Sequence, residues 1–241
     1  MAEIIIGRNA VMEALKSNRE IEKITVAHGA EGSVKQIIGK AKDKKIPLYF
    51  SERNRMDKTA GGGNHQGVIA VVSDYKYCDV EDILARAEER GEKPFIIILD
   101  GLEDPHNLGA IMRTAECAGV HGIIIPKRRS VSVTETVAKT SAGAVEYMLC
   151  AKVSNIANTI EKLQEKGVWV GACDMGDQVY YQQDLTGSLA IVVGGEGSGV
   201  SRLVREKCDF VVSIPMMGNI TSLNASNAAS ILMYEAVRQR I

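Results

Sequence analysis

The stretch "LAIVVGGEGSGVSRLV", residues 189–204, says most about the architecture of the chain. It opens with an uninterrupted apolar run, continues through four glycines around Glu196, and ends in a helical pattern. A continuous Ile/Val run is typical of a strand buried on both faces of a parallel sheet. Glycines between a strand and a helix allow the backbone to come close to another group. The stretch therefore predicts a parallel α/β domain with a ligand loop at the end of this strand.

Similar apolar runs recur through the second half of the chain. They are "FIIILD" (95–100), "GIIIP" (122–126), "GVWVGAC" (167–173) and "FVVSIP" (210–215). Helical patterns lie between several of them, at 107–119, 133–144, 154–167 and 198–208. This alternation predicts a doubly wound α/β domain over residues 94–241.

The first part of the chain forms a separate pattern. Residues 1–74 contain expected helices at 9–17 and 33–44 and expected strands at 23–27, 48–50 and 67–72. A glycine-rich loop, "TAGGGNHQG", occupies residues 59–67, because so many glycines suit neither a helix nor a strand interior. Residues 75–93 contain a polar hinge and one acidic helix, and we expect them to be a linker between two domains.

The charge of the chain is unevenly distributed. The 241 residues carry a formal net charge of −1. Residues 1–76 hold 13 Lys and Arg against 9 Asp and Glu, whereas the remainder holds 16 against 21. A basic first part suits a polyanionic partner, but a surplus of this size also fits an ordinary solvated surface.

Several protein classes are disfavoured by composition. The cysteines are scattered and never spaced as Cys-x-x-Cys, which favours reduced thiols over a disulfide framework or a zinc site. No grouping of His, Asp, Glu or Cys has metal-ligand spacing, so we expect no metal. No apolar run approaches the roughly 20 residues that span a bilayer, and no signal-peptide pattern is present. The sequence predicts a soluble, cytoplasmic protein.

Three loops at expected strand ends carry unusual residues, and the first is "LDGLEDPHNLGAIMRTAECAG", residues 99–119. Asn107 is placed to cap the following helix, which carries Arg113 among apolar residues. Arg113 is therefore expected to be partly buried. It is interpreted either as a site residue or as one partner of an ion pair with Asp104 or Glu116.

The second loop is the glycine loop after residue 193. It is not a Walker A loop, because Val200 stands where that pattern needs Lys. A dinucleotide fingerprint starting at Gly195 fails at the same residue, where it needs Gly. Glu196 would repel phosphate, so the ligand is expected to be neutral or cationic, or the carboxylate to be catalytic.

The third loop is "IPMMGNITSLNASNAASILMYEAVRQR", residues 214–240. Apolar spacing predicts a helix over 223–240, yet the helix begins with small polar residues that are poor helix formers. Thr221 or Ser222 would serve as an N-cap. One cap does not explain so many hydroxyl and amide groups, so a ligand surface at this helix start remains the other interpretation.

Taken in this order, the three loops resemble the motifs of the SpoU (TrmH-like) branch of the SPOUT RNA methyltransferases. In residues 1–74, "IIGRNAVMEAL" (5–15) and "NHQGVIA" (64–70) resemble a ribosomal-protein-L30e-like substrate domain. The resemblance covers nearly the whole chain. It implies an α/β-knot SPOUT domain with a deep trefoil knot, S-adenosylmethionine as cofactor, and a homodimer formed through the C-terminal domain. The implied reaction is 2′-O-methylation of a guanosine ribose in 23S ribosomal RNA.

The resemblance also implies roles for individual residues. The implied catalytic residues are Asn107, Arg113, Glu196, Ser222 and Asn224. The implied cofactor-binding residues are Gly194, Gly195, Ile214 and Leu223. Arg8 and the basic residues Lys127, Arg128 and Arg129 are expected to bind RNA, although a solvated loop explains the last three equally well. A guanidinium does not readily lose its proton at neutral pH, so Arg113 is a poor candidate for a general base. It is expected to act as a cation that stabilises the developing alkoxide.

The sequence leaves three further functions open. Within the family, a transfer RNA 2′-O-methyltransferase is the strongest of them. An RNA-binding protein with an inactive methyltransferase domain is disfavoured because the motif residues are retained. A nicotinamide-dependent oxidoreductase is disfavoured because the glycine loop breaks the fingerprint and lies late in the chain.

Overall fold

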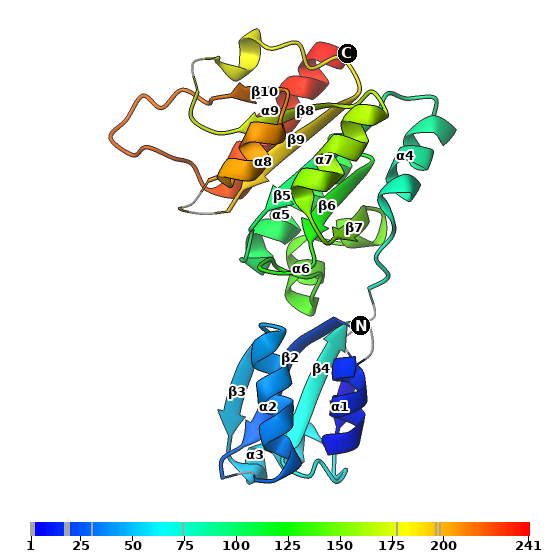
Figure 1. The fold of residues 1–241 in the computed structure, drawn as a ribbon, viewed down its shortest axis with the longest axis vertical. Coiled ribbons are helices and arrows are strands. Elements are labelled where there is room, and N and C mark those ends of the chain that lie inside the picture. Colours follow the sequence, from blue (N-terminus) through cyan, green and yellow to red (C-terminus); the bar gives the residue numbers. More distant parts are fainter. Residues whose placement is uncertain are drawn as a thin grey trace. The chain divides into compact units, whose positions relative to one another are not determined.

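The computed structural model describes residues 3–16, 20–29, 31–73, 75–176, 178–195, 197 and 199–241. The chain divides into two units (Figure 1). One contains residues 1–76 together with 132–135, and the other contains residues 77–131 and 136–241. Each unit has its own sheet and its own apolar core.

The first unit is built on a four-stranded sheet in the order β1-β4-β2-β3. β2 and β3 are parallel, and β4 is antiparallel to both β1 and β2. Val11 of α1 and Ile37 of α2 are fully buried against one face of the sheet, whereas Met56 of α3 packs on the other. The elements are β1 (Glu3–Ile6), α1 (Arg8–Lys16), β2 (Glu20–Ala27), α2 (Ser33–Asp43), β3 (Leu48–Ser51), α3 (Arg53–Thr59) and β4 (Val68–Ser73).

The second unit is built on a six-stranded parallel sheet in the order β10-β8-β9-β5-β6-β7. This confirms the predicted parallel α/β domain. The central strands are buried along almost their whole length, as their continuous apolar sequences require. The strands are β5 (Phe95–Asp100), β6 (Gly122–Pro126), β7 (Leu149–Val153), β8 (Trp169–Cys173), β9 (Leu189–Gly194) and β10 (Phe210–Val212).

Helices cover both faces of this sheet (Figure 1). Ile83, Ile160 and Val204 join one apolar core that packs α4, α7 and α8 on one face. On the other face α5 packs against α9, where the Ser230 hydroxyl donates to the Thr114 hydroxyl oxygen at 3.2 Å. The helices are α4 (Val80–Glu89), α5 (Pro105–Cys117), α6 (Glu135–Thr140), α7 (Ile156–Glu165), α8 (Arg202–Lys207) and α9 (Ala225–Arg240). Short 3₁₀ turns occupy Ala144–Glu146 and Tyr180–Gln182.

The structure differs from the expected linker over residues 75–93. Residues 77–93 belong to the second unit. The reason is α4, whose Ile83 is fully buried. A Cβ added to Gly122 would lie only 2.5 Å from the Ile83 side chain, so the glycine makes room for this helix against β6.

Candidate active site

A cavity of about 330 Å³ lies at the carboxyl edge of the six-stranded sheet. Its walls come from the ends of β8 and β9, the glycine loop, the chain after β10, and the start of α9. These segments are far apart in sequence but meet because parallel strands end at the same edge of a sheet. The cavity is therefore where a ligand of this fold is expected.

The backbone at the end of β9 is so tightly packed that only glycine fits. A Cβ on Gly194 would lie 2.0 Å from the carbonyl carbon of Gly199. A Cβ on Gly195 would lie 2.4 Å from the carbonyl oxygen of Gly101. The Gly195 N–H donates to the Asp100 carbonyl oxygen at 2.9 Å, and the Gly199 N–H donates to the Gly195 carbonyl oxygen at 3.2 Å. Three backbone segments thus meet here, and this part of the cavity wall consists of backbone.

The Asp100 side chain fixes the far end of the glycine loop. One of its carboxylate oxygens accepts a hydrogen bond from the Ser201 N–H at 2.8 Å. Ser201 is the residue immediately before α8. The end of β5 therefore holds both ends of the glycine loop, through the Asp100 carbonyl oxygen and carboxylate.

All four of the expected cofactor residues line the cavity: Gly194, Gly195, Ile214 and Leu223. Ser222, one of the expected catalytic residues, lines it too. The structure thus gathers residues from two of the three sequence loops around one space. Their roles toward a ligand stay predictions.

The start of α9 explains part of the unusual third loop. Its N-cap is Asn224, whose side-chain oxygen accepts from the Ser226 N–H at 2.9 Å and from the Ser226 hydroxyl at 2.6 Å. The expectation that Thr221 or Ser222 caps the helix is therefore wrong. Those two residues are exposed and line the cavity instead. The small polar residues of this loop are divided between capping and the cavity.

The first loop differs from expectation in two ways. The N-cap of α5 is Asp104, whose carboxylate accepts from the His106 N–H at 2.9 Å, and Pro105 occupies the first helical turn. Asn107 is not the cap but lies buried inside that turn. Arg113 is exposed instead of partly buried. In the described ranges it forms no salt bridge with Asp104 or Glu116. Neither Asn107 nor Arg113 lines the cavity.

The fifth expected catalytic residue, Glu196, lies outside the described residues, so the structure does not place its side chain. A different carboxylate does reach the cavity. Asp174 directly follows β8, lines the cavity and is partly buried. One of its oxygens accepts from the Met175 N–H at 2.7 Å, and the other lies 3.8 Å from the Arg205 guanidinium.

Sequence reasoning missed Asp174, together with its neighbours Cys173 and Met175, which also line the cavity. Their position at the end of the predicted strand over residues 167–173 was the only feature of the sequence that could have indicated them. Burial, and then the nearby Asp174 carboxylate, raise the pKa of the Cys173 thiol to about 11. This thiol is therefore protonated at neutral pH, so Cys173 lines the cavity without acting as a nucleophile.

The expected RNA-binding residues lie in both units. Lys127, Arg128 and Arg129 directly follow β6 and are exposed. The Lys127 N–H donates to the Val153 carbonyl oxygen at 2.8 Å, which ties this basic segment to the end of β7. In the first unit, the Arg8 guanidinium donates through Nε to the Gln66 carbonyl oxygen at 3.0 Å.

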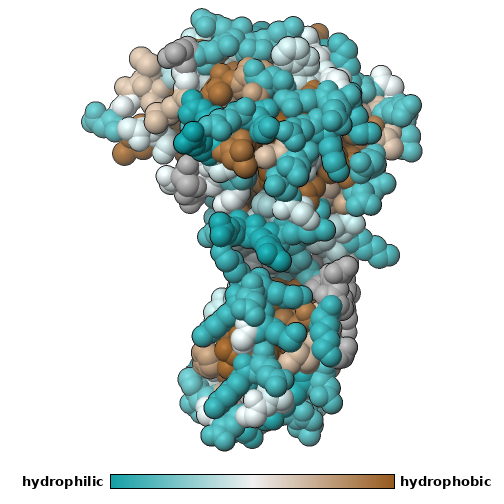
Figure 2. All heavy atoms as spheres, viewed as in Figure 1, coloured by the Kyte–Doolittle hydropathy of each residue, from teal (hydrophilic) through white to brown (hydrophobic). Residues whose placement is uncertain are grey.

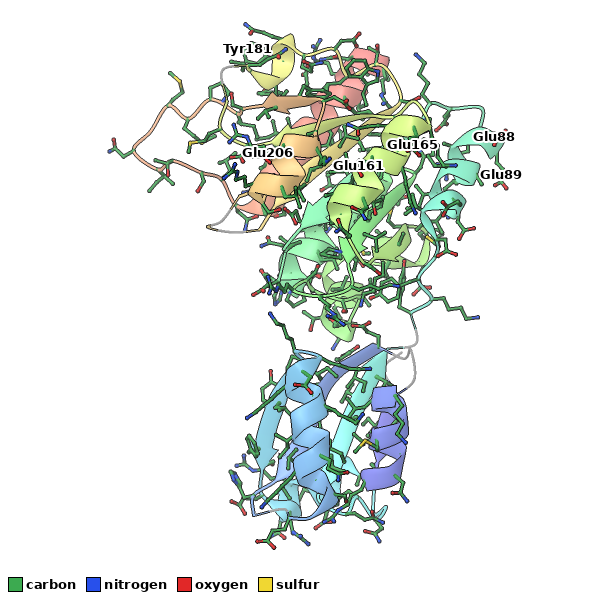
Figure 3. All side chains as sticks on the ribbon, viewed as in Figure 1. Glu88, Glu89, Glu161, Glu165, Tyr181 and Glu206 are labelled. Atoms are coloured by element: carbon green, nitrogen blue, oxygen red, sulfur yellow. The ribbon has the colours of Figure 1, made fainter. Side chains whose placement is uncertain are left out.

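The face covered by α4, α7 and α8 carries charges of both signs. Figure 3 labels carboxylate side chains on each of these helices: Glu88 and Glu89 on α4, Glu161 and Glu165 on α7, and Glu206 on α8. Some are balanced by cations, as in the 2.7 Å pair of Glu206 with Arg202.

Two kinds of feature are absent from the described residues. They contain no cluster of three or more His, Cys, Asp or Glu side chains that could hold a metal ion. None of the described helices is both long and apolar enough to cross a membrane.

Comparison with known protein families identifies the family of the chain that contains this cavity. Residues 94–234 match the SpoU rRNA methylase family. The chain belongs to this family. Residues 4–78 match a second family, described as the substrate-binding domain of RNA 2′-O ribose methyltransferases. This SpoU family chain is therefore an RNA methyltransferase, as its three loops predicted.

Relatives of this SpoU protein match it over almost its whole length. The TrmH family tRNA/rRNA methyltransferase YacO of Bacillus subtilis (strain 168) is 48% identical over 240 residues, covering 99% of this chain and 96% of YacO. A TrmH family tRNA/rRNA methyltransferase of Staphylococcus aureus (strain MSSA476) is 46% identical over 239 residues, covering 98% and 96%. Among solved structures, the SpoU methyltransferase AviRb from Streptomyces viridochromogenes, in complex with AdoMet, shares the fold. It has a TM-score of 0.63 at 23% identity and covers 99% of this chain and 90% of that chain.

Proposed function

We propose that this protein transfers the methyl group of S-adenosylmethionine to the 2′-hydroxyl of a guanosine ribose in 23S ribosomal RNA. The observation that carries the proposal is the cavity at the ends of β8, β9 and β10. Gly194 and Gly195 form part of its wall, and Ser222 lines it too. The substrate would be met in the cytoplasm, where ribosomal RNA is modified.

The cavity suits S-adenosylmethionine in three respects. Peptide groups of the glycine loop that line the cavity can hydrogen-bond to the polar edge of an adenine, and Ile214 and Leu223 offer apolar contact to its faces. The Asp174 carboxylate offers a negative charge to a cationic ligand. Bound there, the cofactor would supply a methyl group already activated by its positively charged sulfur. The deep trefoil knot implied by the resemblance is part of the proposal, because it accounts for the close backbone packing at Gly195.

The chain's own residues would act on the RNA. Arg113 is exposed, and we assign it to binding the phosphate beside the target nucleotide and stabilising the negative charge that develops on the 2′-oxygen. Ser222 and Asn224 stand at the start of α9 and would orient the ribose. Asn107 would support the first turn of α5 from inside, and Glu196 would orient Arg113.

Selection of the RNA would depend on the first unit. It matches a substrate-binding family over residues 4–78 and holds the basic surplus of the chain. Arg8 and the segment Lys127–Arg129 would contact phosphates, which position an RNA without reading its sequence. Transfer RNA is the second candidate substrate, because the names of the relatives include both tRNA and rRNA.

We also propose that the protein is a homodimer formed through the second unit. The apolar side chains of α9 are divided, since Leu232 is fully buried within its own chain whereas Tyr234 is 50% exposed. Further exposed apolar side chains are found beside the cavity: Met217 is 96% and Ile220 is 76% exposed. Figure 2 shows apolar atoms interspersed with polar ones on the loop at the left of this unit. A second copy related by a twofold axis would cover them.

The experiment that separates the two candidate substrates is a map of 2′-O-methyl groups in RNA from a strain that lacks the gene. The proposal expects one guanosine of 23S ribosomal RNA to lose its methyl group. Loss of a methyl group from transfer RNA alone would support the second candidate. Calorimetry with S-adenosylmethionine and with NAD tests for an oxidoreductase, which would bind NAD and not S-adenosylmethionine. Methyl transfer by the purified protein tests for an inactive methyltransferase domain, which would give none.

A further inference from the structure

Two aromatic side chains are exposed on the edge strand of the first unit. Tyr49 is 56% exposed and Phe50 is 55% exposed, and both lie on β3, the last strand of the sheet. Successive residues of a strand point to opposite faces. Leu48 packs against the core formed with α1 and α2, so Phe50 lies on that same face and Tyr49 on the other.

Phe50 forms a stacked pair with His28. The ring centroids are 6.2 Å apart and the ring planes are inclined by 29°. The backbone holds the two residues in register, because β2 pairs with β3 in parallel and the His28 N–H donates to the Ser51 carbonyl oxygen at 3.1 Å. His28 is also exposed. The two rings are therefore both exposed to solvent and held in a fixed arrangement relative to each other.

The pair lies at a basic edge of the sheet. β1, β2 and β3 end there and β4 begins there, which brings Arg8 to the same edge as His28 and Phe50. A Cβ on Gly32 would lie 3.6 Å from the Arg8 guanidinium, so Arg8 adjoins the loop that follows His28. Lys35 is exposed in the first turn of α2, on the same face as the pair.

Other charges of this edge are mixed but mainly positive. Exposed Arg53, Arg55 and Lys58 follow β3 on α3, against the carboxylates Glu31, Glu52 and Asp57. The Asp57 carboxylate is hydrogen-bonded to His65, whose Nε2 lies 3.0 Å away. Fixed exposed rings among cations are the combination that single-stranded RNA binds, because bases stack on the rings and phosphates contact the cations.

We propose that His28 and Phe50 form a stacking platform for an unpaired base of the RNA substrate, with Arg8 and Lys35 contacting the adjoining phosphates. The proposal rests on the proposed function only in taking RNA as the substrate. Stacking needs an unpaired base, so the platform selects loops over duplex RNA without reading the identity of the base.

The test is fluorescence anisotropy of the full chain with a fluorescein-labelled 12-nucleotide single-stranded RNA and with the duplex of the same sequence. Phe50→Leu and His28→Ala should each weaken binding of the single strand about tenfold, which corresponds to the loss of one stacking contact. Duplex binding should stay unchanged. Tyr49→Leu is the matched control, because Tyr49 is equally exposed on the same strand but on the opposite face, and it should change neither affinity by more than about twofold.

Thermal unfolding of each variant shows whether the fold is intact, and these exposed side chains should leave the melting temperature unchanged. Equal effects of Phe50→Leu and Tyr49→Leu, or equal losses on single strand and duplex, would overturn the platform. A change in molecular mass on light scattering with unchanged RNA affinity would overturn it as well, and would make this a surface for self-association.

Methyl transfer by the same variants distinguishes this proposal from the proposed function. If the wild-type protein methylates no ribose but Phe50→Leu still loses the single strand, the proposed function fails and the platform stands. If the wild-type protein methylates 23S ribosomal RNA and Phe50→Leu has the same KM and affinity, only the platform fails.

Discussion

At Gly194 the chain has no room for even one methyl group, because a Cβ would lie 2.0 Å from the backbone of Gly199. Gly194→Ala should therefore force the glycine loop away from β9, lower the stability of the second unit by about 1–3 kcal/mol or more, and abolish cofactor binding. Isothermal titration with S-adenosylmethionine and thermal unfolding measure the two effects. Gly187→Ala is the control, because no atom lies within 4 Å of its added Cβ. Equal cofactor affinities for the two variants would contradict the close packing described here.

Arg113 is expected to act on the RNA and not on the cofactor, since it is exposed and does not line the cavity. Arg113→Ala should lower kcat about 100- to 1,000-fold while the cofactor affinity stays at the wild-type value. Methyl transfer at saturating RNA and calorimetry with S-adenosylmethionine measure these quantities. Arg202→Ala, which removes an exposed arginine paired with Glu206, should keep wild-type turnover. Full turnover by the Arg113 variant would refute its assigned role.

Single residues were predictable where the backbone imposed one choice. The glycines around Glu196 indicated close backbone approach, and Gly194 and Gly195 show that contact. Asn107 was misassigned as a cap because the preceding Asp104 and Pro105 form a better helix start, with a carboxylate at the N-cap and proline in the first turn. Asp174 was missed because a single carboxylate after a strand has no spacing pattern to mark it.

The C-terminal part of α9 holds down the segment that precedes β9. Gln239 bonds twice to this segment, donating to the Gln183 carbonyl oxygen at 3.0 Å and accepting from the Leu185 N–H at 2.8 Å. The Arg240 guanidinium donates to the Leu185 and Gly187 carbonyl oxygens and lies over the Phe95 ring, 4.5 Å from its centroid. The last two turns of α9 are thus fixed by polar contacts more than by an apolar stripe.

Glu235 organises this end of α9 and gives it a pH dependence. Hydrogen bonds from Arg238, and then from Gln239, lower the pKa of its carboxyl from the usual 4.5 to about 2. Because the pKa is lower in the folded state, the carboxylate stabilises the fold above about pH 4.5, and this contribution is lost as the pH falls toward 2. The melting temperature of Glu235→Gln should therefore lie below that of the wild type at neutral pH, and the difference should shrink below pH 4.5.

Differential scanning calorimetry between neutral pH and pH 3 checks this prediction. Glu206→Gln is the control, because its partner Arg202 is highly exposed and such surface pairs contribute little. A Glu235→Gln difference that stays constant over this range would show that the ionised carboxylate is not the stabilising group.

Strands at the centre of the six-stranded sheet were predictable from the sequence because they are continuously apolar. The runs at 95–100 and 189–194 form β5, which is buried up to Asp100, and the fully buried strand β9. The missed strands β1 and β7 both lie at sheet edges and are short, with four and five residues. The missed helix α3 buries only Met56 among its seven residues, so it carries no apolar periodicity. The expected linker included α4 because most residues of this helix are polar or acidic. Only Ile83 and Ala87 are buried against the second unit.

For the molecule as a whole, we predict a homodimer. Light scattering at micromolar concentration should give about twice the 26.1 kDa chain mass. The double variant Met217→Ser, Ile220→Ser should approach the monomer mass, because it removes two of the most exposed apolar side chains beside the cavity. Leu203→Ser, which changes an exposed leucine on α8, should leave the mass unchanged. A monomeric wild-type protein with full methyltransferase activity would exclude this arrangement.

The central claim is ribose methylation of RNA by a cofactor held in the cavity at the ends of β8, β9 and β10. Its most direct test uses purified protein, S-adenosylmethionine with a tritiated methyl group, and 23S ribosomal RNA transcribed in vitro, followed by digestion to nucleosides and chromatography. The account predicts that the tritium elutes with 2′-O-methylguanosine and that Gly194→Ala gives none. Tritium in a base-methylated nucleoside, or equal transfer by the wild-type and Gly194→Ala proteins, would contradict it.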